Sequence, residues 1–117
     1  MKANTREVDS VTIIDLSGRI TLGEDLSQLR QVLRDSLAQG HKHILLNLAE
    51  VTYIDSSGLG ELVSGEVAAS NRGGQLKLLH LTKKVRDLLQ ITKLLTVFDT
   101  YEDEAEAVAS FAKAAGA

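Results

Sequence analysis

The stretch Val51-Thr52-Tyr53-Ile54-Asp55-Ser56-Ser57-Gly58-Leu59-Gly60-Glu61-Leu62 joins two segments of different periodicity. The apolar run at residues 44–48 comes before it and has the length of a buried strand, too short for a free-standing helix. Apolar residues after it recur at helical spacing, namely Leu59, Leu62, Val63 and Val67. The stretch is therefore predicted to be a turn from a strand into a helix, with two serines where the helix begins.

Serine at a helix start has two possible roles. Its side-chain oxygen can accept hydrogen bonds from first-turn amides, which have no partner inside the helix. The same place suits a phosphate, because exposed amides and the positive end of the helix dipole favour negative charge. Gly58 and Gly60 each cost the helix about 1 kcal/mol relative to alanine, a cost that is useful if a partner must approach closely. The residues alone leave a structural cap and a phosphorylated switch both open.

Strands and amphipathic helices alternate along the rest of the chain. Two short strands are expected between residues 5 and 16, with further strands over 43–48, 75–81 and 96–98. Helices are expected from residue 24 to about 39, from the serines to about 71, after a cap at Thr82, and after a cap at Thr100. This order predicts an α/β fold in which helices pack on a mixed or mostly parallel sheet. The length of 117 residues allows one domain and is too short for two.

The composition limits the classes of partner. A net charge of -3 argues against non-specific nucleic-acid binding, and Lys83, Lys84 and Arg86 are expected to form a solvated helix face. The absence of cysteine excludes disulfides and thiolate catalysis. No apolar run approaches the ~20 residues of a membrane span. The start of the chain carries no apolar signal core, so we expect no direct membrane insertion and a cytoplasmic location.

The central turn does not match the motifs of enzymes or cofactor sites. A nucleophile elbow around Ser57 needs glycine at both positions two residues away, and Asp55 and Leu59 stand there. A dinucleotide fingerprint that begins at Gly58 lacks its third glycine. His41 and His43 share one side of a strand but have no third ligand at suitable spacing. We therefore expect no catalytic residues, no cofactor and no metal.

Residues 48–62, with Tyr-Ile-Asp-Ser-Ser-Gly-Leu-Gly at their centre, strongly resemble the signature of the STAS domain. Within that family the chain is similar to the bacterial anti-sigma factor antagonists, also called anti-anti-sigma factors. The resemblance extends over nearly the whole chain and includes the break at Leu16-Ser17-Gly18. It implies a single STAS domain over residues 1–117, with a mixed sheet of four to five strands flanked by about four helices.

The resemblance also implies a partner switch. The unphosphorylated antagonist would bind an anti-sigma factor that is itself a serine kinase, and would thereby free a sigma factor and promote sigma-dependent transcription. The kinase would phosphorylate Ser57, with Ser56 as the alternative acceptor, and a metal-dependent serine phosphatase would reverse the reaction. The switch loop and partner-binding residues that the family implies are Asp55, Ser56, Ser57, Gly58, Leu59, Gly60, Arg19 and Thr21.

One loop departs from the family pattern. Sporulation-type antagonists often carry acidic residues there, as Gly-Glu-Leu-Asp, whereas this chain has Arg19 and Thr21 in those places. The partner-facing surface is therefore expected to differ in charge.

Two other functions remain open. One is a constitutive STAS subunit of a stress-signalling or lipid-transport complex without a phosphoserine switch. The other is nucleotide binding at the helix start, which the lack of an adjacent lysine disfavours.

Overall fold

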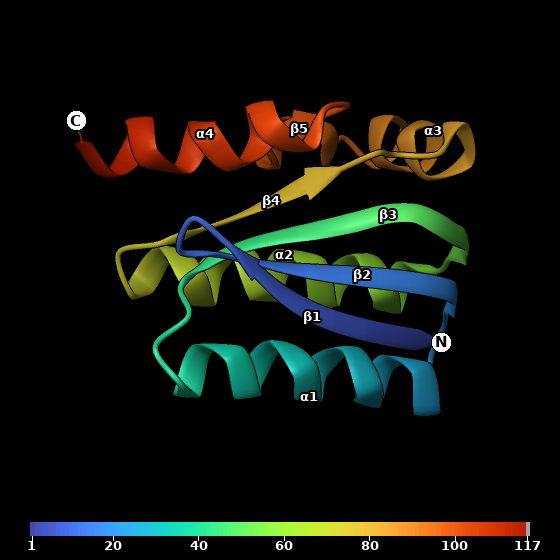
Figure 1. Ribbon diagram of the computed structural model, residues 1–117. Coiled ribbons are helices and arrows are strands. Elements are labelled where there is room, and N and C mark those ends of the chain that lie inside the picture. Colours follow the sequence, from blue (N-terminus) through green and yellow to red (C-terminus); the bar gives the residue numbers. More distant parts are fainter. Residues whose placement is uncertain (117) are drawn as a thin grey trace.

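The computed structural model describes the backbone of residues 1–116 and the side chains of residues 1–112. The strands are β1 (Lys2–Val8), β2 (Val11–Ile20), β3 (His43–Ile54), β4 (Gln75–Leu79) and β5 (Thr100–Tyr101). The helices are α1 (Glu24–Ala38), α2 (Ser56–Asn71), α3 (Lys83–Ile91) and α4 (Glu104–Gly116), with a 3₁₀ turn η1 at Leu95–Val97. Within residues 1–116 this confirms the expected α/β fold (Figure 1). No helix of that range is long and apolar enough to cross a membrane.

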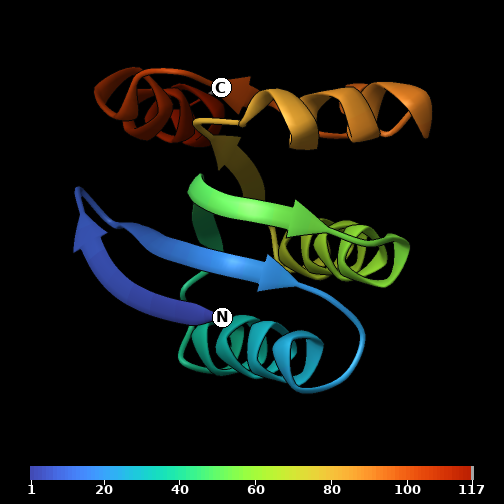
Figure 2. The ribbon, with the colours of Figure 1, turned by 90° about the vertical axis from the view of Figure 1, so that its right-hand side faces the viewer.

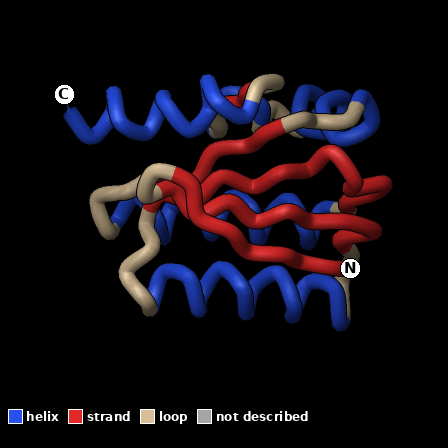
Figure 3. The backbone as a smooth tube through the Cα atoms, in the orientation of Figure 1, coloured by secondary structure: helices blue, strands red, loops and turns tan. Residues whose placement is uncertain are grey.

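The five strands form one mixed sheet in the order β1-β2-β3-β4-β5 (Figure 3). β1 is antiparallel to β2, and every later pair is parallel. The hairpin between β1 and β2 turns at Asp9 and Ser10, whose φ angles are 50° and 69°. Two positive φ angles give the kind of tight turn whose twist matches that of paired strands. β2, β3 and β4 run in the same direction. The turn from β3 into α2 therefore lies at the end of the sheet where β2 also ends.

Side chains alternate across the sheet and so build two separate cores. Ile14, Leu46 and Leu78 belong to the larger core, which also contains leucines of α1, α2 and α3. Their neighbours Leu45 and Leu79 belong to a smaller core closed by Ala107, Val108 and Phe111 of α4. Figure 2 shows α2 and α4 on opposite sides of the sheet. Both faces of the sheet are therefore buried, and the turn from β3 into α2 is attached to this packed sheet.

A buried lysine joins β4 to α4 in the smaller core. The Lys77 side chain is 4% exposed, and its Nζ donates a hydrogen bond to Ser110 Oγ at 2.8 Å. The same nitrogen lies 3.7 Å from Asp99 Oδ2 and 4.7 Å from the centroid of the Phe111 ring. The His43 ring packs edge-on against Phe111 at 5.6 Å, so His43 is half-buried against the smaller core.

Three local predictions are wrong. Residues 95–97 form η1, and the edge strand lies at residues 100–101, where the backbone N–H groups of Leu78 and His80 donate to Asp99 and Tyr101. The cap of α4 is Asp103, not Thr100, because the Asp103 carboxylate accepts from the Glu106 amide at 2.9 Å. On α2, Val67 is 53% exposed, since Gly65 and Ala69 occupy the inward positions of that helix.

Candidate functional site

Asp55 is the N-cap of α2, and its carboxylate holds two backbone amides. Oδ1 accepts a hydrogen bond from Gly58 N at 2.8 Å, and Oδ2 accepts one from Leu22 N at 2.9 Å. The first bond closes the helix start, and the second ties it to the loop after β2. These bonds, the Gly58 amide above all, favour the charged carboxylate and hold the pKa of Asp55 below its ordinary value. Of the residues Asp55, Ser56 and Ser57, the aspartate is thus the one that caps the helix, and the serine cap that the sequence left open is not formed.

Ser56 and Ser57 are the first two residues of α2, and the cap at Asp55 frees both hydroxyls from that role. Within the part of the chain that the structure describes, neither hydroxyl forms a hydrogen bond. Ser56 is exposed and Ser57 is half-buried. The first turn of α2 contains no acidic residue, so the capping carboxylate of Asp55 is the acidic group that faces the positive end of the helix dipole. The site combines two free hydroxyls with a place that favours negative charge.

The glycines and Leu59 face different sides of the helix. A Cβ on Gly58 would lie 2.6 Å from Ile54 Cγ1 and 2.8 Å from Ile20 O, so this glycine lets α2 pack against β2 and β3. Leu59 is 2% exposed and belongs to the larger core. The Leu59 side chain is therefore packed inside the fold, and the assignment of Leu59 to the switch loop stays a prediction. A Cβ on Gly60 would meet no atom within 4 Å, so Gly60 is the open position of the pair.

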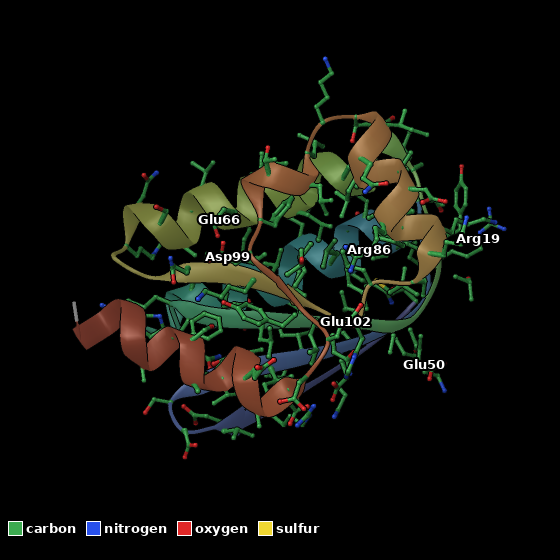
Figure 4. The ribbon with its side chains drawn as sticks, turned by 90° about the horizontal axis from the view of Figure 1, so that it is seen from above. Arg19, Glu50, Glu66, Arg86, Asp99 and Glu102 are labelled. Atoms are coloured by element: carbon green, nitrogen blue, oxygen red, sulfur yellow. The ribbon has the colours of Figure 1, made fainter. Side chains whose placement is uncertain are left out.

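Arg19 and Thr21, the two departures from the family pattern, lie at the end of β2. Arg19 pairs in register with Tyr53 of β3, and its guanidinium carbon is 5.0 Å from the centroid of the Tyr53 ring. This is a cation–π distance, and Figure 4 shows Arg19 at the margin of the molecule. Thr21 Oγ1 donates a hydrogen bond to Asp25 Oδ2 at 3.1 Å, so its hydroxyl is used inside the fold. Arg19 alone of the two presents a charge to solvent.

A groove of about 720 Å³ lies between the serine turn and α3. Its apolar walls are Tyr53 and Ile54 at the end of β3, and Leu88 and Ile91 of α3. Ser56 lines this groove, whereas Ser57 is not among its lining residues. A side chain of a partner or a modification on Ser56 would enter the groove directly.

The sequence analysis missed this groove and the apolar side chains around it. Leu22 is 72% exposed, Ile91 is 78% exposed and Tyr53 is 39% exposed. These residues come from three segments that only the sheet brings together, so no local pattern predicts them. The basic pair Lys83-Lys84 is exposed as expected, but both side chains also line the groove. Leu22, an apolar residue in the loop before α1, was the one local signal, because Ile91 falls on the apolar spacing of α3.

Comparisons with known proteins agree on the family. The family model of the STAS domain matches residues 2–107. The anti-sigma F factor antagonist of Paenibacillus polymyxa is 28% identical over 100 residues, which are 84% of each chain. The crystal structure of TM1081 from Thermotoga maritima, a candidate anti-sigma factor antagonist, has a TM-score of 0.87, with 27% identity and 94% of each chain covered.

A third match shows the same fold at lower sequence identity. SpoIIAA, a Bacillus cell fate determinant and anti-sigma factor antagonist, has been solved both unphosphorylated and phosphorylated. The two forms give TM-scores of 0.71 and 0.73 at 20% and 22% identity. Both cover 93% of this chain, with 96% and 98% of the SpoIIAA chains covered. This chain belongs to the STAS domain family, and the expected resemblance to its anti-sigma factor antagonists is confirmed.

Proposed function

We propose that this chain is an anti-sigma factor antagonist that binds an anti-sigma factor with serine kinase activity, and that phosphorylation at the start of α2 abolishes this binding. The observation that carries the proposal is the cap at Asp55, which leaves two serine hydroxyls free in a first turn that has no acidic residue of its own. The relatives described as anti-sigma factor antagonists support the class of partner. The role is that of a binding module and requires no catalytic residue of its own.

Phosphorylation would act on the interface and leave the fold in place. A phosphate adds about -1.5 to -2 charges and three acceptor oxygens. The helix end accepts that charge, because it lies where the dipole of α2 is positive. A partner docked over the same turn would instead meet new bulk and a second negative group beside Asp55. The likeness of this fold to both the unphosphorylated and the phosphorylated form of SpoIIAA supports tolerance of the modification.

The two serines differ as phosphate acceptors. The family resemblance points to Ser57, and that assignment stays a prediction. The exposures favour Ser56, which is open to solvent and lines the groove, whereas Ser57 is half-buried. Ser56 is therefore the better presented to the active site of a kinase, and we propose it as an acceptor beside Ser57.

The docking surface that we propose surrounds these serines. Gly60 provides close access and Arg19 a positive charge, while Leu22, Tyr53 and Ile91 supply exposed apolar area. In the cytoplasm a serine phosphatase would return the phosphorylated chain to its binding form. Because Arg19 stands where sporulation-type antagonists often carry an acid, the matching contact on the kinase is expected to be acidic.

Mass spectrometry on protein taken from cells in several growth states tests this function. Intact masses would report the number of phosphates, and fragments across residues 50–70 would assign each to Ser56 or Ser57. Ser56→Ala and Ser57→Ala variants serve as controls for the assignment. A phosphate on either serine supports the switch and identifies its site. If none is found in any growth state, or after incubation with serine kinases of the anti-sigma type, the switch is excluded and a constitutive assembly subunit is favoured.

A further inference from the structure

We propose that Lys84 of α3 is the counter-ion of a phosphate on Ser56, so that phosphorylation closes the groove between α2 and α3, a step that rests on the proposed phosphorylation of this turn. Ser56 and Lys84 line the same groove from opposite elements. A phosphate attached to Ser56 would therefore extend into the space that the lysine also faces.

The other charged groups of the groove are already engaged. Lys83 Nζ lies 3.1 Å from Asp87 Oδ2 in an ion pair one helical turn apart. The Asp55 carboxylate holds the amides of Gly58 and Leu22. Lys84 has no carboxylate within 4.0 Å among residues 1–112, whose side chains the structure describes. Of the two ammonium groups in the groove, Lys84 is thus the one without a paired acid among the described side chains.

The Lys84 ammonium lies near the Tyr53 wall of the groove, whose ring the Arg19 guanidinium also approaches. Its Nζ lies 5.9 Å from the centroid of the Tyr53 ring, which forms part of the apolar wall. Tyr53 precedes Ser56 by three residues, so the lysine already leans from α3 toward the turn. An ammonium is attracted more strongly by a phosphate dianion than by the face of a ring. Phosphorylation would therefore draw Lys84 from Tyr53 onto the phosphate.

This contact would change what the groove can accept. With the phosphate and Lys84 joined across it, the walls at Tyr53 and Ile54 would be covered, and a partner side chain would be excluded. Ser57 does not line the groove, so a phosphate there would leave Lys84 on Tyr53 and block a partner only by its own bulk and charge. The two serines would then block binding in physically different ways.

The test compares two homogeneous phosphoproteins, made with genetically encoded phosphoserine at position 56 or at position 57. Phosphorus NMR over a pH titration gives the second pKa of each phosphate, which is about 6 in the absence of neighbours. Lys84 should lower this pKa at position 56, because a nearby cation favours the dianion. We expect Lys84→Met to raise it there by about half a unit, the size of a solvent-screened charge pair a few ångströms apart, and to leave position 57 unchanged.

Two matched variants complete the test. Lys42→Met removes an exposed lysine just before the start of β3, whereas the serine turn follows the end of that strand. This variant should leave both pKa values unchanged. Lys83→Met removes the lysine paired with Asp87 and should raise the pKa at position 56 by less than Lys84→Met does. Equal pKa values with and without Lys84, or the same rise in the Lys42 variant, would overturn the proposal. The titration does not depend on a kinase, so it can succeed even if cells never phosphorylate this turn.

Discussion

The starts of α2 and α4 use the same cap and differ in the charge of their first turns. Asp55 accepts a hydrogen bond from Gly58 N at 2.8 Å, and Asp103 accepts one from Glu106 N at 2.9 Å. The first turn of α4 then supplies two acids, Glu104 and Glu106, whereas the first turn of α2 supplies none. Beyond the aspartate cap that both helices share, α4 therefore carries negative charge in its first turn, whereas α2 has two free hydroxyls there.

Glu104 shows what the acids of α4 do for the fold. Its carboxylate binds Arg6 of β1, which also pairs with Asp15 of β2 at 2.8 Å. The charge at the start of α4 therefore joins three elements, and hydrogen bonds from Arg6 hold the pKa of Glu104 below its ordinary value. The start of α2 has no such network among the described side chains, and Lys84 is the cation that we propose would meet a charge added at Ser56.

The largest expected effect concerns the inward side of the α2 start. Leu59→Ala removes a side chain that is 2% exposed and should lower the free energy of unfolding by about 2–5 kcal/mol. Val67→Ala, at a position that is 53% exposed on the same helix, should change it by less than about 0.5 kcal/mol. Urea denaturation measures both. Equal losses would mean that Leu59 is not a core residue and could contact a partner.

The two glycines of α2 should respond to alanine with opposite signs. Gly58→Ala forces a Cβ against Ile20 O and Ile54, and should destabilise the fold by about 1–3 kcal/mol. Gly60→Ala meets open space and should stabilise the helix by up to about 1 kcal/mol. Thermal melts would resolve this difference. A stabilised Gly58→Ala protein would contradict the close packing of α2 on β2.

A smaller effect is expected when an acid is added to the first turn of α2, which has none. Ser56→Glu adds a carboxylate where the dipole favours one and should stabilise the protein by about 0.3–1 kcal/mol at low salt. At α4 the matched change is Glu106→Gln, which removes such a carboxylate and should destabilise by a similar amount. Both effects should shrink in 1 M salt. Destabilisation by Ser56→Glu would mean that the α2 start does not accept negative charge.

The smallest expected effect is that Asp55 and Glu66 make the free energy of unfolding depend on pH in opposite directions. The pKa of Asp55 lies below its ordinary value of 3.8, so its charge contributes stability above that pH and loses it as the pH falls through the lower, folded-state pKa. Burial raises the pKa of Glu66 above 4.5, so Glu66 costs stability as the pH rises from 4.5 through its folded-state pKa. Urea unfolding from pH 3 to 7 should show that Asp55→Asn removes the first dependence and Glu66→Gln the second. Figure 4 shows Glu66 beside Asp99, whose charge adds to the raised pKa.

The sequence predicted the fold well where patterns are long and locally consistent. The apolar run at residues 44–48 predicted a strand that the structure extends to Ile54 as β3, and β4 lies within the predicted strand at residues 75–81. The Thr82 cap of α3 is confirmed by its bond from Val85 N at 3.3 Å. The β-branched residues at 96–97 led to a wrong prediction of a strand over 96–98. The chain there forms η1 after the end of α3, and it pairs with the sheet only at residues 100–101. Local propensity did not decide that edge of the sheet; pairing with β4 did.

The sequence located the turn from strand into helix, but it did not identify the residue that caps the helix or the groove beside it. Aspartate and serine both cap helices well, so the sequence alone did not distinguish Asp55 from its neighbours. That one-residue difference leaves both serine hydroxyls without a capping role and sets the helical phase that buries Leu59. The groove depends on α3 crossing beside the end of β3, a tertiary contact with no local signature.

The most direct test measures binding and stability together on the homogeneous phosphoproteins. The dissociation constant of each would be determined for an anti-sigma factor kinase that binds the unmodified chain, alongside its melting temperature. We expect phosphate on the acceptor serine to weaken binding at least about 100-fold, roughly 2.7 kcal/mol, with a melting temperature equal to or slightly above that of the unmodified protein. Unchanged affinity would contradict the switch, and a loss of affinity accompanied by unfolding would contradict the claim that the helix start accepts the charge.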